Sequence, residues 1–267
     1  MRINQSGASL FLRCAEAYRR RYIEGDIIPP TFVLHRGSSV HKVAAASFAR
    51  KRDRGRPLSK KSTVELAVET FEQSVRAQGV YLMPDEESAR SKLHDDTLND
   101  VRRLSALFAT TVVKHHDPDL IEEKIEVPFT GDHLLHGTLD LTTRESRIVD
   151  LKNRSKAGRA DEYRRSLQFV TYGLLYLVKK QTMPKGFVAE ELVLTKEATN
   201  NTIELEAPEQ VDFHTAIIQY TRIADAIGAG AFPGAYGNAH AWWCSAESCG
   251  YWWTCPLVPE HRRRRPR

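Results

Sequence analysis

Apolar residues follow two different spacings along the chain, and the change between them falls near residue 120. Before it, apolar positions recur every three to four residues, which is typical of amphipathic helices. The helices predicted there cover residues 8–23, 37–50, 62–78 and 86–116. After it, alternating apolar positions and short turns predict three consecutive strands, at residues 121–129, 133–143 and 147–152. The remaining elements are predicted as a helix, two strands and a last helix, at residues 161–180, 186–195, 202–206 and 208–229.

This order of elements predicts an α/β fold. Three successive strands joined by short turns favour an antiparallel meander, and the helix at 161–180 is expected to pack across it. The earlier helices form an all-α addition upstream of this core. We expect one domain over residues 1–267, divided into an N-terminal helix (1–30), a helical region (36–118), an α/β core (119–230), a Cys- and Trp-rich segment (231–256) and a basic tail (257–267).

The most informative stretch of the core is GTLDLTTRESRIVDLK, residues 137–152. Side chains two positions apart on a strand share a face, so Asp150 and Lys152 point the same way. A tight connection between the strands is expected to bring Asp140 beside them. Two carboxylates are hard oxygen ligands for Mg or Mn, and such an ion beside a lysine is suited to hydrolysing a phosphodiester. Asp-x-Lys alone is more often ordinary surface on an edge strand, but the second aspartate upstream favours the metal site.

Four further residues are candidates for the same site, and each also has an ordinary structural explanation. Gln168 and Tyr172 are four apart on one predicted helix, so they share a face and are placed to hold a phosphate or the lysine. Imidazole is an acceptable Mn ligand, which makes His41 a candidate, although a lone histidine is more often packed or exposed. Glu126 lies in the strand at 121–129, where it points either to the same sheet face or to solvent.

Composition narrows the class of protein less than these motifs do. Hydrophobic residues make up 41% and charged residues 27%, which suits a globular chain, and the net charge of +5 is a weak bias towards anionic partners. No run approaches the roughly 18 apolar residues of a membrane span. The first residues lack an apolar stretch followed by a cleavage site, so we expect a cytoplasmic protein with no membrane association. The basic tail is expected to be solvated and to touch nucleic acid at most nonspecifically.

The four cysteines are the second informative feature. Cys244, Cys249 and Cys255 lie within twelve residues of one another, and Cys14 lies near the opposite end. In a cytoplasmic chain, clustered cysteines favour a metal over a disulfide, and four thiolates match either an iron-sulfur cluster or zinc. All four tryptophans lie in the same segment and would shield such a cluster from solvent. The alternative is a local hydrophobic core with free thiols.

Together these residues resemble the RecB-like branch of the PD-(D/E)XK nuclease superfamily, over most of the chain. The motifs that carry the resemblance are GSSVH at 37–41, EVP at 126–128, GTLD at 137–140, VDLK at 149–152 and QFVTY at 168–172. The resemblance implies a restriction-endonuclease-like core, in which helices flank a mixed central sheet, with a helical N-terminal insertion and a Cys-rich C-terminal staple.

The resemblance also implies a role for each site residue. It implies that metal is held by His41, Asp140, Asp150 and the carbonyl of Leu151, with Glu126 as a further candidate ligand. Lys152 would be the catalytic lysine, and Gln168 and Tyr172 would contact DNA near the metal. One subgroup has one early and three late cysteines that hold a 4Fe-4S cluster, which implies the same role for Cys14, Cys244, Cys249 and Cys255. The Cys-x4-Cys spacing at 244–249 departs from the usual Cys-x2-Cys of that subgroup, so zinc stays an alternative.

The function implied by the resemblance is a Mg- or Mn-dependent DNA exonuclease. Its substrate would be single-stranded DNA or DNA ends, and its setting recombination, repair or phage DNA processing, with recombination proteins as partners. The alternative from a different class is a noncatalytic nucleic-acid-binding or recombination-accessory module of the same fold. The intact set of Asp140, Asp150 and Lys152 favours the enzyme.

Overall fold

The strands that follow residue 117 form the centre of a mixed sheet, seen in a computed structural model that describes residues 1–263. The strands are β1 (Arg2–Asn4), β2 (Pro118–Thr130), β3 (His133–Thr143), β4 (Arg147–Arg154), β5 (Gly186–Leu194) and β6 (Ala198–Leu205). As expected, β2, β3 and β4 form an antiparallel meander. β5 runs parallel to β4 and antiparallel to β6, so the sheet is mixed.

Strand β3 has a gap along one of its edges. β2 pairs with it over nearly its whole length and occupies the other edge. On the remaining edge, β1 pairs in parallel with residues 134–136, whereas β4 pairs with Leu141 and Thr142. Residues 137–140 of β3 therefore lie between the two neighbouring strands, at a place where the sheet is open.

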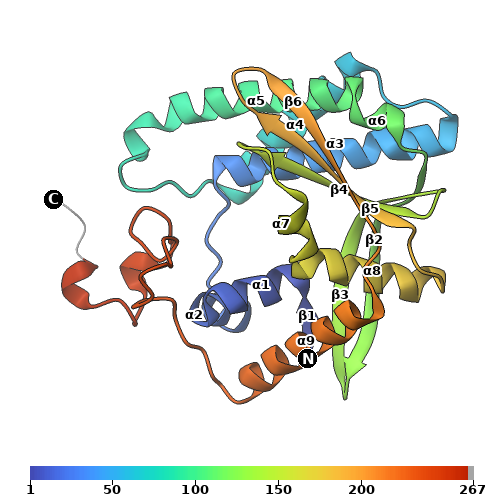
Figure 1. Cartoon of the computed structure of the whole chain (residues 1–267). Helices are drawn as coiled ribbons and strands as arrows, with labels where there is room; N and C mark the ends of the chain where they lie inside the picture. Colours follow the sequence, from blue (N-terminus) through green and yellow to red (C-terminus); the bar gives the residue numbers. More distant parts are fainter. Residues whose placement is uncertain (264–267) are drawn as a thin grey trace.

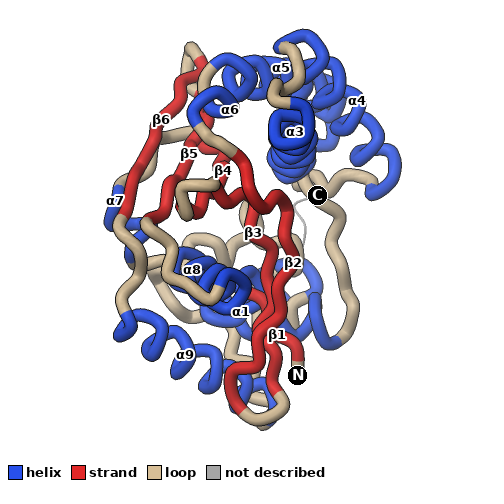
Figure 2. The backbone as a smooth tube through the Cα atoms, turned by 90° about the vertical axis from the view of Figure 1, so that its right-hand side faces the viewer, coloured by secondary structure: helices blue, strands red, loops and turns tan. Residues whose placement is uncertain are grey.

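Helices cover both faces of the sheet (Figure 1, Figure 2). On one face, α3 (Phe32–Arg54) and α5 (Arg90–Thr110) bury Val40, Phe48 and Phe108 against Val149 and Val188. On the other, α8 (Leu167–Lys180) buries aromatic and aliphatic side chains against Leu139 and Ile148. Helix α4 (Lys60–Gln78) packs outside α3 and α5, while α9 (Gln210–Gly228) packs with α8 and α1 (Gln5–Arg13). The predicted α/β fold with a helical region upstream is confirmed.

Several predicted helices are interrupted, and the capping residues show why. The predicted helix 8–23 is broken after Arg13, where α1 ends because Cys14 has an extended backbone. It continues as α2 (Ala15–Tyr18) and a π-helical turn (Arg19–Ile23). The predicted helix 86–116 is a 3-10 turn (Glu87–Ala89), then α5 and α6 (Val112–His115). The predicted helix 161–180 is split into α7 (Ala160–Arg164) and α8, where the Ser166 hydroxyl accepts the Phe169 N–H as a new N-cap.

Other boundaries shift for similar local reasons. Helix α3 begins at Phe32, five residues before the prediction, because the Thr31 hydroxyl accepts the Leu34 N–H and caps it. Strand β1 was not predicted. The division of the chain into five segments stays a prediction, and residues 264–267 of the basic tail lie outside the described residues. Among residues 1–263, no helix is both long and apolar enough to cross a membrane.

Candidate active site

The opening in the sheet brings Asp140 and Asp150 together. The register of β3 and β4 pairs Leu141 with Val149, so these two aspartates stand opposite each other one position further on, where the strands separate. The backbone N–H of Leu151 donates to Asp140 Oδ2 at 3.3 Å. This hydrogen bond joins the Asp140 side chain of β3 to the backbone of β4 and fixes the two carboxylates relative to each other.

Lys152 and Gln168 hold the buried carboxylate of Asp150. Lys152 Nζ donates to Asp150 Oδ1 at 3.0 Å and to Gln168 Oε1 at 3.0 Å. Gln168 Nε2 donates to Asp150 Oδ1 at 3.2 Å and to the Tyr172 hydroxyl at 2.8 Å. The second oxygen, Asp150 Oδ2, is 2.9 Å from Lys152 Nζ but accepts no aligned hydrogen bond, so it keeps acceptor capacity. The structure thus connects Asp150, Lys152, Gln168 and Tyr172 in one hydrogen-bond network, and their functional roles stay a prediction.

The acidities of the two aspartates are driven apart by their surroundings. Burial raises the pKa of Asp150 to about 6, against the positive charge of Lys152, and the nearby charge of Asp140 adds to the rise. Burial alone would also raise the pKa of Asp140, but the hydrogen bond from His41 and the charges of His41 and Lys152 lower it below its ordinary value. Burial and the two carboxylates raise the pKa of Tyr172, so its hydroxyl stays protonated.

A second group of possible metal ligands lies on the other side of Asp140. One ligand atom each from His41, Glu122 and Asp140 lie within 4.8 Å of one another, and His41 Nδ1 is 3.4 Å from Asp140 Oδ2. His41 comes from α3, and Glu122 comes from β2, which pairs with β3 and places Glu122 beside Asp140. An imidazole with two carboxylates is a donor set that suits Mn or Mg. The sequence prediction named His41 and Asp140 but missed Glu122.

Glu122 reaches this group through an irregularity in β2. The pairing of β2 with β3 shifts register between Pro118 and Ile121, and Glu122 adopts a φ of 49°, which is uncommon for a residue other than glycine. Nothing in the sequence IEEK signals that conformation. Glu126, the candidate named from the sequence, lies four residues further along β2, where its carboxylate pairs with Arg2.

Two cavities meet at Asp140. One, of about 500 Å³, is lined by Arg2, Lys124, Glu126, Gly137 and Tyr172, among other residues. The other, of about 890 Å³, is lined by Val33, Arg36, Lys42, His41 and Glu122, among other residues. Ser6 and Asp140 belong to both, so a continuous open groove passes over Asp140, with basic side chains on both sides.

The sequence matches the profile of the PD-(D/E)XK nuclease superfamily over residues 2–256. The chain belongs to the PD-(D/E)XK nuclease superfamily. It is therefore a hydrolytic nuclease, and nucleases of this superfamily use divalent metals. In this nuclease, Asp140, Asp150 and Lys152 come together at the open strand edge.

One solved structure agrees with the fold of this nuclease. A protein from Eubacterium rectale, described as a "Putative exonuclease", is 12% identical to it, with a TM-score of 0.53 over 86% of this chain and 83% of the other. This likeness supports the fold alone. A second structure, that of SSO0001, is 14% identical over 65% of this chain and 77% of the other, with a TM-score of 0.39. No curated protein matches the sequence.

The four cysteines of the nuclease gather at one cavity although they come from opposite ends of the chain. Cys14, Cys244, Cys249 and Cys255 all line it, together with Tyr251, Trp252 and other mainly apolar side chains. Burial, together with the three neighbouring thiols, raises the pKa of Cys244 to about 11. The Tyr251 hydroxyl donates to the carbonyl of Asp26 at 2.6 Å, which adds a second link between the two ends. The tryptophans divide: Trp243 stacks under Arg13, whereas Trp242 is 74% exposed.

Proposed function

We propose that this nuclease is a divalent-metal-dependent DNA exonuclease of the RecB-like branch, acting on single-stranded DNA or on DNA ends. The observation that carries the proposal is the meeting of Asp140, Asp150 and Lys152 at the open edge of β3, with His41 and Glu122 beside them. Recombination, repair or phage DNA processing is the proposed setting, and recombination proteins are the proposed partners.

The residues at the open edge fit a Mg or Mn ion. Asp140 contributes to the close group with His41 and Glu122, and Asp150 Oδ2 is a buried carboxylate oxygen without an aligned hydrogen bond. We assign His41, Asp140, Asp150 and the Leu151 carbonyl as ligands, and favour Glu122 over Glu126 as the ligand from β2. A divalent ion supplies a Lewis acid that polarises the phosphate and stabilises the negative charge that develops on it.

The neighbouring side chains divide the remaining work among them. Lys152 offers a positive charge next to Asp150, where it can orient the attacking water and stabilise the charge on the phosphate. Gln168 fixes the Lys152 ammonium group by accepting its hydrogen bond, and Tyr172 in turn accepts one from Gln168. Because the Tyr172 hydroxyl stays protonated, its proton is available to a phosphate oxygen. These two residues of α8 therefore position both the lysine and the substrate.

One observation supports a nucleic-acid substrate, and one supports exonuclease action on it. The groove over Asp140 carries Arg2 and Lys124 on one side and Arg36 and Lys42 on the other, which suits a phosphate backbone. The Eubacterium rectale protein of the same fold is described as a "Putative exonuclease", and at 12% identity this supports the activity only by analogy.

The cysteine cavity is proposed to hold a 4Fe-4S cluster, with zinc as the alternative. Four thiols lining one mostly apolar cavity fit either group, because both are bound by four thiolates. Cys14 follows α1, whose first residues line the active-site groove, so a bound group would tie the C-terminal segment to that wall of the groove. This role is structural and takes no part in hydrolysis.

A cleavage assay tests the proposed function. End-labelled single- and double-stranded DNA, both linear and circular, would be incubated with the protein in the presence and absence of Mn. The proposal expects Mn-dependent loss of linear DNA only, and an Asp150→Asn variant without activity. Cleavage of circular DNA would show that the protein is an endonuclease and not an exonuclease. Binding of DNA without cleavage under any divalent ion would favour the noncatalytic accessory module instead.

A further inference from the structure

A buried glutamate outside the catalytic site organises the chain that follows Lys152. Glu191, in the middle of β5, is 0% exposed and stands beside Lys152 in the parallel register of β4 and β5. Its carboxylate accepts hydrogen bonds from the Tyr163 hydroxyl at 2.6 Å, Asn201 Nδ2 at 2.6 Å and the Gly158 N–H at 2.8 Å. Arg154 Nη1 lies 3.2 Å from Glu191 Oε1. Burial alone would raise the pKa of Glu191, but these partners lower it below its ordinary value.

Three of these partners belong to one segment, residues 154–165, which we name the basic arch. Arg154 lies at its start, Gly158 in its middle and Tyr163 near its end. Glu191 thus fixes the arch at three points. Arg154 also pairs with Glu162 at 2.9 Å, which links the two ends of the arch directly.

Gly158 shows how closely the arch is fitted to Glu191. A Cβ at this position would lie 2.5 Å from Glu191 Oε1 and 3.0 Å from Arg154 Nη1. Both atoms are held by the Tyr163 hydroxyl, so neither is free to move away cheaply. The backbone of the arch therefore approaches the carboxylate at a distance that only glycine permits.

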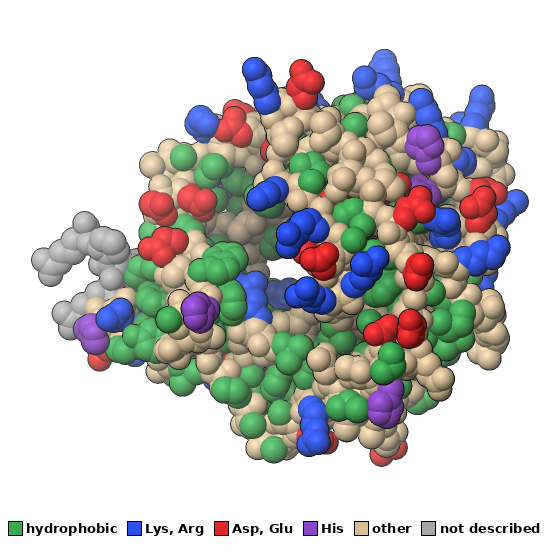
Figure 3. All heavy atoms as spheres, in the orientation of Figure 1, with side chains coloured by type: hydrophobic (Ala, Val, Ile, Leu, Met, Phe, Trp, Pro, Cys, Tyr) green, Lys and Arg blue, Asp and Glu red, His purple; other side chains and the backbone are tan. Residues whose placement is uncertain are grey.

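The anchored backbone leaves basic side chains pointing to solvent. Lys156, Arg159, Arg164 and Arg165 are all exposed. Within residues 1–263, Arg159 has one distant acidic neighbour, Asp161 at 3.8 Å, and the other three have no acidic partner. Figure 3 shows Lys and Arg side chains gathered around a hollow in the middle of the face on which Figure 1 shows α7 and the start of α8.

The arch is joined to the catalytic residues at both ends. It begins two residues after Lys152, and Arg154 shares the sheet face of Lys152 and Asp150 because strand side chains alternate. It ends three residues before Gln168, next to the N-cap of α8. A nucleic acid whose phosphate lies at Asp150 and Lys152 therefore has the exposed basic side chains of the arch beside its neighbouring phosphates.

We propose that the basic arch is a binding surface for the phosphate backbone of the nucleic-acid substrate, and that Glu191 is the positioning residue that holds it beside the catalytic lysine. This proposal rests on the proposed function for the identity of the substrate. The contacts it assigns are to phosphates, so they add affinity without sequence preference.

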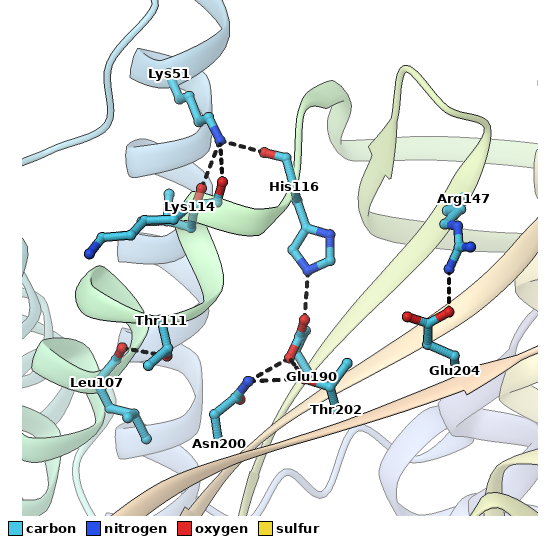
Figure 4. A network of polar contacts seen from close by, with 11 residues as sticks. Lys51, Leu107, Thr111, Lys114, His116, Arg147, Glu190, Asn200, Thr202 and Glu204 are labelled. Carbon is cyan, nitrogen blue, oxygen red and sulfur yellow. Dashed lines mark hydrogen bonds and ion pairs between the residues drawn. The ribbon is translucent and has the colours of Figure 1, made fainter.

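Neighbouring Glu190 provides a matched control for Glu191. It is equally buried in β5, but it points to the opposite sheet face, where His116, Asn200 and Thr202 hold its carboxylate (Figure 4). Glu190→Gln and Glu191→Gln remove the same charge from adjacent positions of one strand. Only the second position is connected to the arch.

The experiment measures binding of short single-stranded DNA in EDTA over a range of salt concentrations, so the result does not depend on cleavage. In a variant with Lys156, Arg159, Arg164 and Arg165 all changed to Ala, affinity at about 0.1 M salt should fall on the order of 100-fold. The slope of log affinity against log salt should fall by roughly 3, as expected for four lost phosphate contacts. The control changes four exposed basic residues at the far end of α3 and on or before α4, namely Arg54, Arg56, Lys60 and Arg76, and should leave both unchanged.

Glu191 is tested in the same assay. Glu191→Gln should weaken DNA binding about 10-fold, Gly158→Ala should do the same, and Glu190→Gln should not. Adding Glu191→Gln to the variant without the four basic side chains should cause no further loss, because a positioning residue acts only through the groups that it positions. Equal salt slopes for the arch and control variants would overturn the proposal, as would equal binding by the Glu190 and Glu191 variants. If the wild-type protein cleaved no DNA while the arch variant still bound DNA more weakly than the control variant, only the proposed function would be refuted.

Discussion

Gln168 accepts a hydrogen bond from Lys152 at 3.0 Å while donating one to Asp150 at 3.2 Å. One amide thus bridges the two members of the Asp-x-Lys motif, from a helix that begins fifteen residues later. The amide is suited to this because it offers an acceptor to the ammonium group and a donor to the carboxylate at the same time.

The bridge predicts that Gln168→Ala slows cleavage more than it weakens DNA binding. Lys152 would lose one of its two fixed partners and Asp150 one of its donors, so the lysine would be less well oriented. We expect a fall in kcat of about 10- to 100-fold with a KM within about threefold of wild type. Steady-state cleavage of labelled DNA measures both, and Gln73→Ala on the remote helix α4 serves as the control. An unchanged kcat would contradict the positioning role.

Lys152→Met is predicted to abolish most of the activity while keeping the fold. Methionine retains much of the volume of the side chain but removes the positive charge that faces the phosphate. Loss of one such group costs on the order of 10²- to 10³-fold in rate. Cleavage rates at saturating Mn measure the effect. Lys185→Met, an exposed lysine next to β5, should cleave as wild type does.

Glu122 and Glu126 make opposite predictions for metal binding. Glu122→Gln should weaken Mn binding by about 10-fold or more, because it removes a charged ligand from the group with His41 and Asp140. Glu126→Gln, four residues away on the same strand, should leave Mn affinity unchanged because its partner is Arg2. Titration of Mn followed by electron paramagnetic resonance measures both affinities. If Glu126→Gln weakened Mn binding more than Glu122→Gln does, Glu126 would be the metal ligand from β2, as the sequence suggested.

The cysteine cavity predicts that the metal content depends on both ends of the chain. Protein purified without oxygen should be brown, with absorbance at about 400 nm, if the cavity holds iron and sulfide. Cys14→Ser should remove that colour as fully as Cys249→Ser does, since both thiols line the same cavity. Elemental analysis for iron and zinc decides between the two groups. A colourless wild-type protein that contains zinc would support the alternative, and one without either metal would leave four free thiols.

Glu191 predicts a pH-dependent part of the stability. Its pKa in the folded protein lies below the ordinary value of 4.5. The stabilisation that it provides is therefore complete above pH 4.5 and is lost as the pH falls below 4.5 through the folded-state pKa. Glu191→Gln should lower the free energy of unfolding by about 2 kcal/mol near neutral pH.

The deficit of Glu191→Gln should become smaller on going from about pH 7 to about pH 3.5. Urea unfolding at a series of pH values measures it, with wild type as the reference. A deficit that stays constant or grows in acid would show that the charge of Glu191 contributes nothing to the stability.

The sequence by itself determined the type and order of most elements and the shared faces of the candidate site residues. Asp150 and Lys152 are two apart on a strand, and Gln168 and Tyr172 are four apart on a helix, so local geometry alone puts each pair on one side. The antiparallel connection between β3 and β4 is short, which made the approach of Asp140 predictable as well. These properties depend on a few neighbouring residues, so they can be deduced from spacing.

Only the tertiary structure decided what surrounds that core of the site. Strand β1 has three residues, too few to show a period, yet its pairing with β3 makes the far boundary of the gap at residues 137–140. Glu122 enters the metal group through a backbone conformation that its sequence does not signal. Cys14 joins three cysteines more than 200 residues away, and Glu191 joins three points of the basic arch. Such contacts depend on how distant segments pack, and local spacing carries no information about that.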